Sequence, residues 1–235
     1  MKRAVEPLDN PIWHALTHAQ KNVSEGDDRA RRFQYDIGPL AGLACQTEEA
    51  YASLAALARP DELLVLFLNE PPVVPEGWTL AVGGQLTQMV CDAPLSPPNN
   101  APNIELLTEA DIPAMLELTR LTKPGPFRPQ TNRLGRYVGI RQNGRLAAMA
   151  GERLQVNGYT EVSAVCTHPD FQGQGYARAL VTDVAAHIRQ QGHIPFLHTG
   201  MDNQGAIRVY ERLGFRQRRL IHLAVLRCSV AVGLR

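Results

Sequence analysis

Apolar residues recur at helical spacing in the second half of the chain. After Tyr176 they stand at Ala177, Leu180, Val181, Val184, Ala185 and Ile188. This spacing predicts an amphipathic helix, which stops at Gly192. The segment from Glu161 to Thr167 predicts a strand, so the residues between the two elements form a strand-to-helix turn.

The same patterning predicts the other elements of the second half. Strands are expected at residues 104–107, 137–141, 146–154, 195–199 and 218–226, and helices at residues 109–121 and 204–213. The dipeptide Asn143-Gly144 is a hairpin signal between two of these strands. The strands at 137–141, 146–154 and 161–167 are therefore expected to be successive and antiparallel.

The first half has an α/β pattern without a glycine-rich turn. Helices are expected at residues 11–22 and 47–58, and strands at residues 32–35, 63–68 and 80–91. Prolines and asparagines from Leu95 to Asn103 stop helices and strands alike. We therefore expect an N-terminal α/β half, residues 1–102, and a C-terminal domain, residues 103–235, in a chain of the α/β (α+β) class.

Composition narrows the class of protein. The 235 residues carry a net charge of +1, which suggests neither a nucleic-acid partner nor a membrane partner. The sequence shows no N-terminal apolar segment and no membrane-spanning run, so we expect a soluble, cytoplasmic protein. Four cysteines lie far apart without metal-type spacing, which predicts reduced thiols and no metal site.

The turn before the amphipathic helix reads Gln172-Gly-Gln-Gly175-Tyr-Ala177. Such a turn directs several backbone N–H groups at one point, where the helix dipole adds positive potential. Gly173 and Gly175 have no Cβ, so the main chain can take positive φ and approach oxygen atoms closely. This favours a site for an anion carried by a cofactor. A tight connection without a ligand is the alternative.

Two other phosphate-binding patterns do not fit this turn. A P-loop ends in Gly-Lys-Ser/Thr, whereas the corresponding residues here are Gly175-Tyr-Ala177. A dinucleotide-binding fold needs a third glycine and an acid on the next strand, but the segment from Ile194 to Thr199 has no acid. The turn is therefore predicted to bind neither nucleoside triphosphates nor dinucleotides.

What remains resembles the GNAT superfamily of N-acetyltransferases. The matching residues are Gln172, Gly175 and Ala177 in the turn, and Asn203, Ala206, Tyr210, Gly214 and Phe215 in and after the next helix. Ala177 replaces the more frequent glycine, which the family pattern allows. The similarity covers residues 103–226, and the segments 122–127 and 195–198 look like the branch that also resembles glycine N-acyltransferases.

This resemblance implies a fold and an activity. The fold is a central, mostly antiparallel mixed sheet flanked by helices, with an N-terminal half that would be a degenerate GNAT-like half. The activity is transfer of the acetyl group of acetyl-CoA to a primary amine of a small molecule or peptide, by direct attack in a ternary complex. Two alternatives stay open: amino-acid N-acylation with a longer acyl-CoA, and a non-catalytic coenzyme A-binding regulatory module. Strand-exchange dimers are frequent in such folds, so a homodimer is a further expectation.

The resemblance also assigns residues to the cofactor. In the resembled fold the strand before the turn splays away from the next strand, so the backbone at Val165, Cys166 and Thr167 would pair with the pantetheine arm. The other expected cofactor residues are Gln172, Gly173, Gln174, Gly175, Tyr176, Ala177, Arg178, Asn203 and Ala206. An ordinary buried strand is the alternative for the first group, and a purely helix-capping role is the alternative for Asn203.

A base is needed because an amine must lose a proton before it attacks a thioester. Glu161 lies eleven residues before Gln172, the spacing at which members of the superfamily often carry a strand carboxylate as base. Strand alternation puts Glu161, Ser163, Val165 and Thr167 on one face, provided that no bulge intervenes. A solvent-exposed glutamate at a strand end is the alternative.

Tyr210 is the candidate acid that would protonate the departing thiolate. It lies two helical turns after Asn203, so the two residues can face the same groove. A tyrosine buried in an amphipathic core is the alternative. We interpret His168 as part of a His-Pro turn, His198 as a satisfied polar residue of a strand, and Cys166 as a small buried residue.

The segment from Thr122 to Thr131 is too rich in proline for a helix or a central strand. In the resembled fold this segment borders the acceptor pocket, so Phe127 and Arg128 are the candidate substrate-binding residues. A guanidinium facing the pocket would favour an acceptor with a carboxylate. A rigid structural connection is the alternative.

Overall fold

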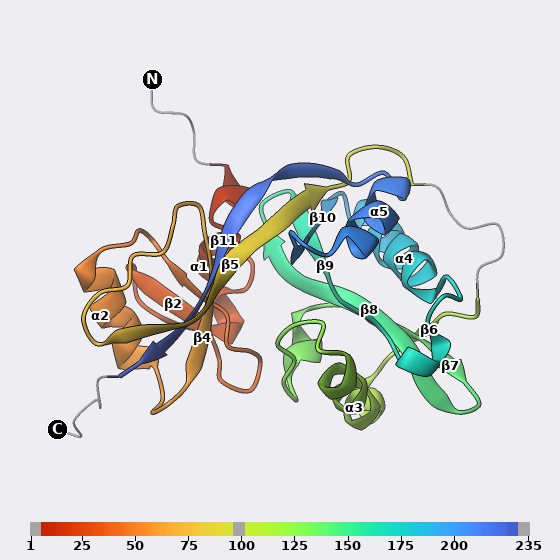
Figure 1. Ribbon diagram of the computed structural model, residues 1–235, viewed down its shortest axis with the longest axis horizontal. Helices are drawn as coiled ribbons and strands as arrows, with labels where there is room; N and C mark the ends of the chain where they lie inside the picture. Colours follow the sequence, from red (N-terminus) through yellow and green to blue (C-terminus); the bar gives the residue numbers. More distant parts are fainter. Residues whose placement is uncertain (1–5, 96–101, 230–235) are drawn as a thin grey trace. The chain divides into compact units, whose positions relative to one another are not determined.

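The computed structural model describes residues 6–95 and 102–229, which form two compact units. The first unit holds the described residues up to Leu86, Leu154–Asn157 and those from Leu220 onward, and the second holds Thr87–Arg153 and Gly158–Arg219. These boundaries differ from the expected division after residue 102, because three long strands supply residues to both units. The strands are β5 (Trp78–Val90), β8 (Arg145–Val156) and β11 (Arg216–Cys228) (Figure 1). Residues 96–101 of the proline-rich break lie outside the described residues.

The first unit contains a small antiparallel sheet and two helices. The sheet has the order β1 (Ser24–Gly26), β2 (Ala30–Phe33) and β3 (Ala41–Leu43), and the helices are α1 (Pro11–Thr17) and α2 (Glu48–Leu57). Strand β4 (Leu63–Leu68) pairs antiparallel with the last part of β11. The sequence did not predict β1 and β3, because three residues are too few for an alternating pattern.

The second unit contains the sheet that carries the conspicuous turn. Its strands follow the order β5, β10, β9, β8, β7 and β6. The bounds not yet given are β6 (Glu105–Leu106), β7 (Tyr137–Gln142), β9 (Tyr159–Thr167) and β10 (Ile194–Gly200). The hairpin predicted at Asn143-Gly144 is confirmed, since both residues have positive φ and β7 pairs antiparallel with β8. Strand β10 instead runs parallel to β9.

Three helices pack on this sheet, namely α3 (Ile112–Thr122), α4 (Tyr176–Gln190) and α5 (Gln204–Arg212) (Figure 1). Helices α4 and α5 share one hydrophobic cluster, to which Val162 of β9 belongs. Helix α3 packs in another cluster with Tyr137 and Cys166. Val165 packs against the first cluster and the neighbouring Cys166 belongs to the second, so these two clusters mark the two faces of β9.

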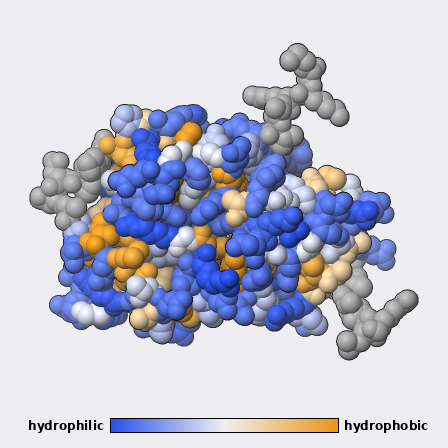
Figure 2. All heavy atoms as spheres, turned by 180° about the vertical axis from the view of Figure 1, so that it is seen from behind, coloured by the Kyte–Doolittle hydropathy of each residue, from blue (hydrophilic) through white to orange (hydrophobic). Residues whose placement is uncertain are grey.

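Hydrophilic side chains cover most of the face seen in Figure 2, and hydrophobic ones appear there in small groups. None of the helices in the described ranges is long and apolar enough to cross a membrane.

Candidate active site

The predicted anion-binding turn has the expected backbone. Gly173 and Gly175 have φ angles of 78° and 76°, and α4 begins directly after Gly175, as predicted. A Cβ built on either glycine would meet no atom within 4 Å, so open space lies in front of both. The Tyr176 hydroxyl donates a hydrogen bond of 2.7 Å to Gln174 Oε1. The turn therefore combines a helix N-terminus, two glycines in the left-handed region and room for an anion.

Strands β9 and β10 pair at one end only. Their parallel ladder joins Ile194–Phe196 with Tyr159–Glu161. Among the described residues, this ladder ends at the pair Phe196–Glu161. Both strands extend further, to Thr167 and Gly200, without pairing with each other in it. The strands thus separate at Glu161, and the β9 residues expected to face a pantetheine arm, Val165 to Thr167, follow this point.

Glu161, Ser163, Val165 and Thr167 were predicted to share one face of β9. This prediction is wrong after Ser163, because a bulge intervenes. Ala164 has a φ of 53°, which interrupts the regular alternation. Val165 consequently packs against the same cluster as Val162, and Ala164 and Cys166 pack on the α3 side. Glu161 is therefore not on one face with Val165. Burial raises the pKa of the Cys166 thiol to about 11, which fits a buried residue and not a nucleophile.

Glu161 is completely buried, so the alternative of a solvent-exposed glutamate is wrong. Arg153 donates from Nε to Oε2 and from Nη2 to Oε1, both at 2.8 Å. His198 Nδ1 lies 2.7 Å from Oε1. Burial alone would raise the pKa of Glu161, but the charge and hydrogen bonds of Arg153, together with the His198 bond, lower it to about 2. The carboxylate is therefore ionised at neutral pH.

The hydrogen-bonded group continues beyond His198. Gln88 Nε2 lies 3.0 Å from His198 Nε2, and Arg218 Nη1 donates to Gln88 Oε1 at 2.8 Å. The interpretation of His198 as a satisfied polar residue is confirmed by these bonds. Sequence reasoning missed Arg153 and Gln88. The signal for Arg153 was a charged residue inside a predicted apolar strand, whereas nothing marked Gln88.

The two motif residues on and before α5 have different surroundings. Asn203 accepts a hydrogen bond of 3.1 Å from the Ala206 N–H and so caps the helix, as its alternative role required. Tyr210 is buried in the cluster shared with α4, and burial raises its pKa to about 12. Since Val162 belongs to that cluster and the neighbouring Glu161 points the other way, Tyr210 and Glu161 lie on opposite faces of the sheet.

The proline-rich loop lies close to the buried ion pair. The ring of Phe127 packs edge-on against Tyr137, with centroids 5.6 Å apart. A Cβ on Gly125 would stand 3.9 Å from Nη1 of Arg153. Tyr137 is buried, and its hydroxyl has no hydrogen-bond partner within the described ranges. Arg128 N–H donates to Thr131 Oγ1 at 2.7 Å, which shapes the end of the loop.

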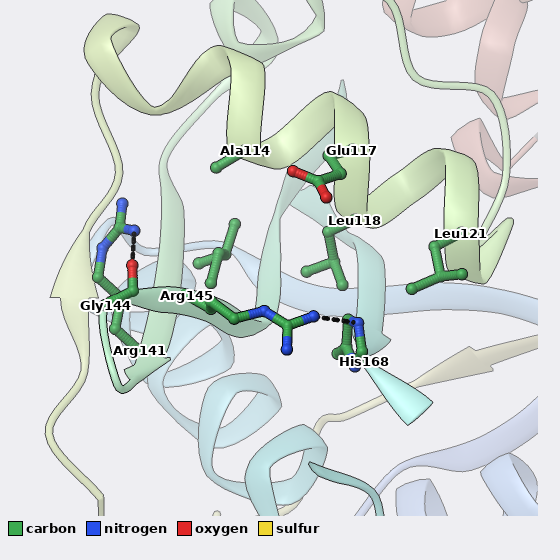
Figure 3. Close-up of a pocket in the computed structure, with 9 residues that line it drawn as sticks. Ala114, Glu117, Leu118, Leu121, Arg141, Gly144, Arg145 and His168 are labelled. Atoms are coloured by element: carbon green, nitrogen blue, oxygen red, sulfur yellow. Dashed lines mark hydrogen bonds between the residues drawn. The ribbon is translucent and has the colours of Figure 1, made fainter. Parts of the chain in front are cut away.

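A groove of about 210 Å³ lies between α3 and the β7–β8 hairpin (Figure 3). Glu117, Leu118 and Leu121 line it from the helix, and on the side opposite the helix Arg145 Nη2 lies 2.9 Å from His168 Nε2. His168 Nδ1 also accepts a bond from the Asp170 N–H, as expected for a residue that shapes the His-Pro turn. No group of three or more His, Cys, Asp or Glu suited to a metal occurs in the part of the chain that the structure describes.

Comparison with known proteins identifies the family. Residues 137–222 match the model of the family described as FR47-like protein. A solved structure from Novosphingobium aromaticivorans DSM 12444, assigned to acetyltransferases of the GNAT family, is 38% identical, covers 96% of this chain and 100% of its own, and has a TM-score of 0.89. The chain therefore belongs to the GNAT family of acetyltransferases, and the predicted mixed α/β fold of that family is confirmed.

Two further relatives match shorter segments. The [ribosomal protein bS18]-alanine N-acetyltransferase of Escherichia coli strain K12 is 29% identical over 120 residues, which are 48% of this chain and 80% of that protein. An uncharacterized N-acetyltransferase of Methanocaldococcus jannaschii is 34% identical over 62 residues, or 26% of this chain and 27% of that protein. The chain thus spans about a quarter of the length of this second relative. These relatives do not support the branch that resembles glycine N-acyltransferases.

Proposed function

We propose that this protein transfers the acetyl group of acetyl-CoA to a primary amine of a small molecule or peptide. One observation carries the proposal. The open glycine turn at the α4 N-terminus follows the strand that separates from β10 at the buried, ionised Glu161. The proposed anion site and the carboxylate are thus close in sequence, since β9 continues from Glu161 to Thr167 and the turn follows.

The residues present fit coenzyme A. The backbone N–H groups at Gln172 to Gly175 and the dipole of α4 would hold the pyrophosphate, in the open space before the two glycines. The backbone at Val165, Cys166 and Thr167 would pair with the pantetheine amides. The remaining residues proposed to border the cofactor are Tyr176, Ala177, Arg178, Asn203 and Ala206. When bound, acetyl-CoA supplies an acetyl group on a thioester that an amine can attack.

Proton transfer is assigned to Glu161 and Tyr210, which would act from opposite faces of the sheet at the gap between β9 and β10. Glu161 is ionised at neutral pH and so can accept a proton from the ammonium form of the acceptor through a water molecule. Because the pKa of Glu161 is low, the proton would not stay on the carboxylate and would pass through the water to bulk solvent. The raised pKa of Tyr210 keeps the phenol protonated, which is the form that can donate to the departing thiolate.

The acceptor is proposed to lie beside the loop from Thr122 to Thr131. Phe127 offers an apolar wall there, and Arg128 would favour an acceptor that carries a carboxylate. The Escherichia coli relative is named for an alanine of a ribosomal protein. Both an alanyl peptide and free amino acids are therefore reasonable first acceptors for this chain.

The test measures thiol release from acetyl-CoA with a panel of amines, including a peptide that begins with alanine, several amino acids and polyamines. The wild type is expected to acetylate at least one amine, and Glu161→Gln to lower kcat about a hundredfold or more. Glu62→Gln is the matched control, because Glu62 forms a similar buried pair with Arg32 in the first unit. Full kcat in Glu161→Gln would refute its role, and tight acetyl-CoA binding without turnover would favour a regulatory module.

Acyl chain length separates the remaining alternative. Acetyl-CoA competes with butyryl-CoA and benzoyl-CoA in the same assay at a fixed amine concentration. The proposal expects the acetyl group to be transferred with the highest kcat/KM. Preference for the longer acyl groups with an amino acid would instead support amino-acid N-acylation.

A further inference from the structure

His198 lies between two side chains from different strands. Its Nδ1 is 2.7 Å from Glu161 Oε1 on β9, and its Nε2 is 3.0 Å from Gln88 Nε2 on β5. The His198 side chain is 2% exposed, and Gln88 and Glu161 are fully buried. The imidazole is therefore held inside the sheet layer, next to the point where β9 and β10 separate.

The direction of each hydrogen bond follows from the donor groups. Arginine has only donors, so the bond from Arg218 Nη1 to Gln88 requires the amide oxygen of Gln88 to face Arg218. The Gln88 NH₂ group then faces His198 and can only donate. His198 Nε2 must accept this bond, and its single ring proton must be on Nδ1, from which it donates to Glu161.

We propose that Gln88, oriented by Arg218, fixes the Nδ1–H tautomer of His198, and that His198 is thereby a positioning residue for Glu161. The inference rests on the proposed role of Glu161 in acetyl transfer. None of these three residues belongs to the glycine turn or to α5. They come from β5, β11 and β10, which lie on the β10 side of the gap between β9 and β10.

The arrangement holds the carboxylate from two sides. Arg153 on β8 binds both oxygens of Glu161, and His198 on β10 binds Oε1 from the opposite neighbouring strand. Along these hydrogen bonds, the charged groups nearest to His198 are Glu161 on β9, Arg153 bound to Glu161, and Arg218 bound to Gln88. Tyr137 on β7 interacts electrostatically with Arg153, Glu161 and Glu152. Without the His198 donor, Arg153 alone would determine the orientation of the carboxylate.

Two substitutions separate positioning from proton transfer by the imidazole. In His198→Asn the amide nitrogen takes the place of Nδ1 and can still donate to Glu161, whereas in His198→Gln the amide takes the place of Nε2. We expect kcat to stay within about threefold of wild type for His198→Asn and to fall roughly tenfold to a hundredfold for His198→Gln, as for losses of supporting hydrogen bonds. The KM for acetyl-CoA should be unchanged in both variants.

Equal losses in the two variants would overturn the proposal, because the imidazole itself would then carry the proton. Unchanged kcat in both variants would overturn it as well. The melting temperature and acetyl-CoA affinity of each variant establish that it is folded.

A nuclear magnetic resonance experiment tests the tautomer independently of activity. Nitrogen-15 shifts of the histidine rings are measured in wild type and in Gln88→Glu, with His198→Gln used for assignment. We expect the wild-type proton on Nδ1 of His198, and an added proton on Nε2 in Gln88→Glu, because a carboxylate at this position can only accept. A wild-type proton on Nε2 would overturn the inference. If no amine is acetylated, the proposed function fails while the tautomer can still be measured.

Discussion

The Nδ1 atom of His198 lies 2.7 Å from the carboxylate of Glu161, a residue of the last pair that joins β9 to β10. Arg153 completes the surroundings of the carboxylate from β8. Glu161, which the family spacing indicates as a base, is therefore a buried anion whose orientation Arg153 and His198 fix.

The Glu161 ion pair should make stability depend on pH in a defined window. The pKa of Glu161 is lowered in the folded state from 4.5 to about 2, so the unfolded chain binds its proton more readily. Its contribution to the free energy of unfolding is therefore complete above pH 4.5 and is lost as the pH falls toward 2. Urea unfolding of wild type and Glu161→Gln across this range measures it. A stability difference that disappears above pH 5 would contradict the assignment.

Gly175→Ala should weaken acetyl-CoA binding because residue 175 lies at the proposed pyrophosphate site, and not only because alanine is strained at a positive φ. Gly175 has a φ of 76°, and Gly192, after the other end of α4, has a φ of 79°. Either alanine should cost about 1–2 kcal/mol of stability, since both sites are open but left-handed. Only Gly175→Ala should raise the Kd for acetyl-CoA, because its methyl group would occupy the proposed pyrophosphate site. Equal Kd values for the two variants would place the anion elsewhere.

Tyr210→Phe should lower kcat by about a hundredfold at unchanged KM for acetyl-CoA, the magnitude typical of losing a general acid. The phenyl ring keeps its place in the α4 cluster, so the fold should be retained. Tyr51→Phe is the matched control, because burial also raises the pKa of Tyr51 to about 12 but this residue lies in the first unit. Steady-state kinetics decide the point, and a full kcat in Tyr210→Phe would assign Tyr210 to the core alone.

Tyr137→Phe should leave the protein as stable as wild type or more stable by about 1 kcal/mol, because a buried hydroxyl without a partner is costly to keep. The hydroxyl of Tyr137 has no hydrogen-bond partner among the described residues. Thermal unfolding measures the change. A loss of stability larger than about 1 kcal/mol would mean that the hydroxyl is hydrogen-bonded in solution.

Long periodic elements and the glycine turn could be predicted from the sequence, and less regular features could not. The apolar spacing of α4 and the Asn143-Gly144 hairpin depend on neighbours in the chain, which the sequence shows directly. The bulge at Ala164 does not, because nothing in the neighbouring sequence marks an alanine for a positive φ. It changed which residues share a face with Glu161.

Local sequence patterns could not predict the residues that surround Glu161 either. The spacing to Gln172 singled out Glu161, but Arg153 and His198 contact it from two neighbouring strands, and Gln88 contacts His198 from a third. Their proximity follows from strand order and register, which single-sequence patterns do not specify. The alternative of an exposed Glu161 at a strand end is wrong for this reason.

The most direct test of the account is amine-dependent thiol release from acetyl-CoA by wild type, Glu161→Gln and Glu62→Gln under identical conditions. The account predicts that wild type and Glu62→Gln turn over at similar rates per folded molecule, while Glu161→Gln is slower by about a hundredfold or more. Equal turnover of Glu161→Gln and Glu62→Gln on the same amine would contradict it.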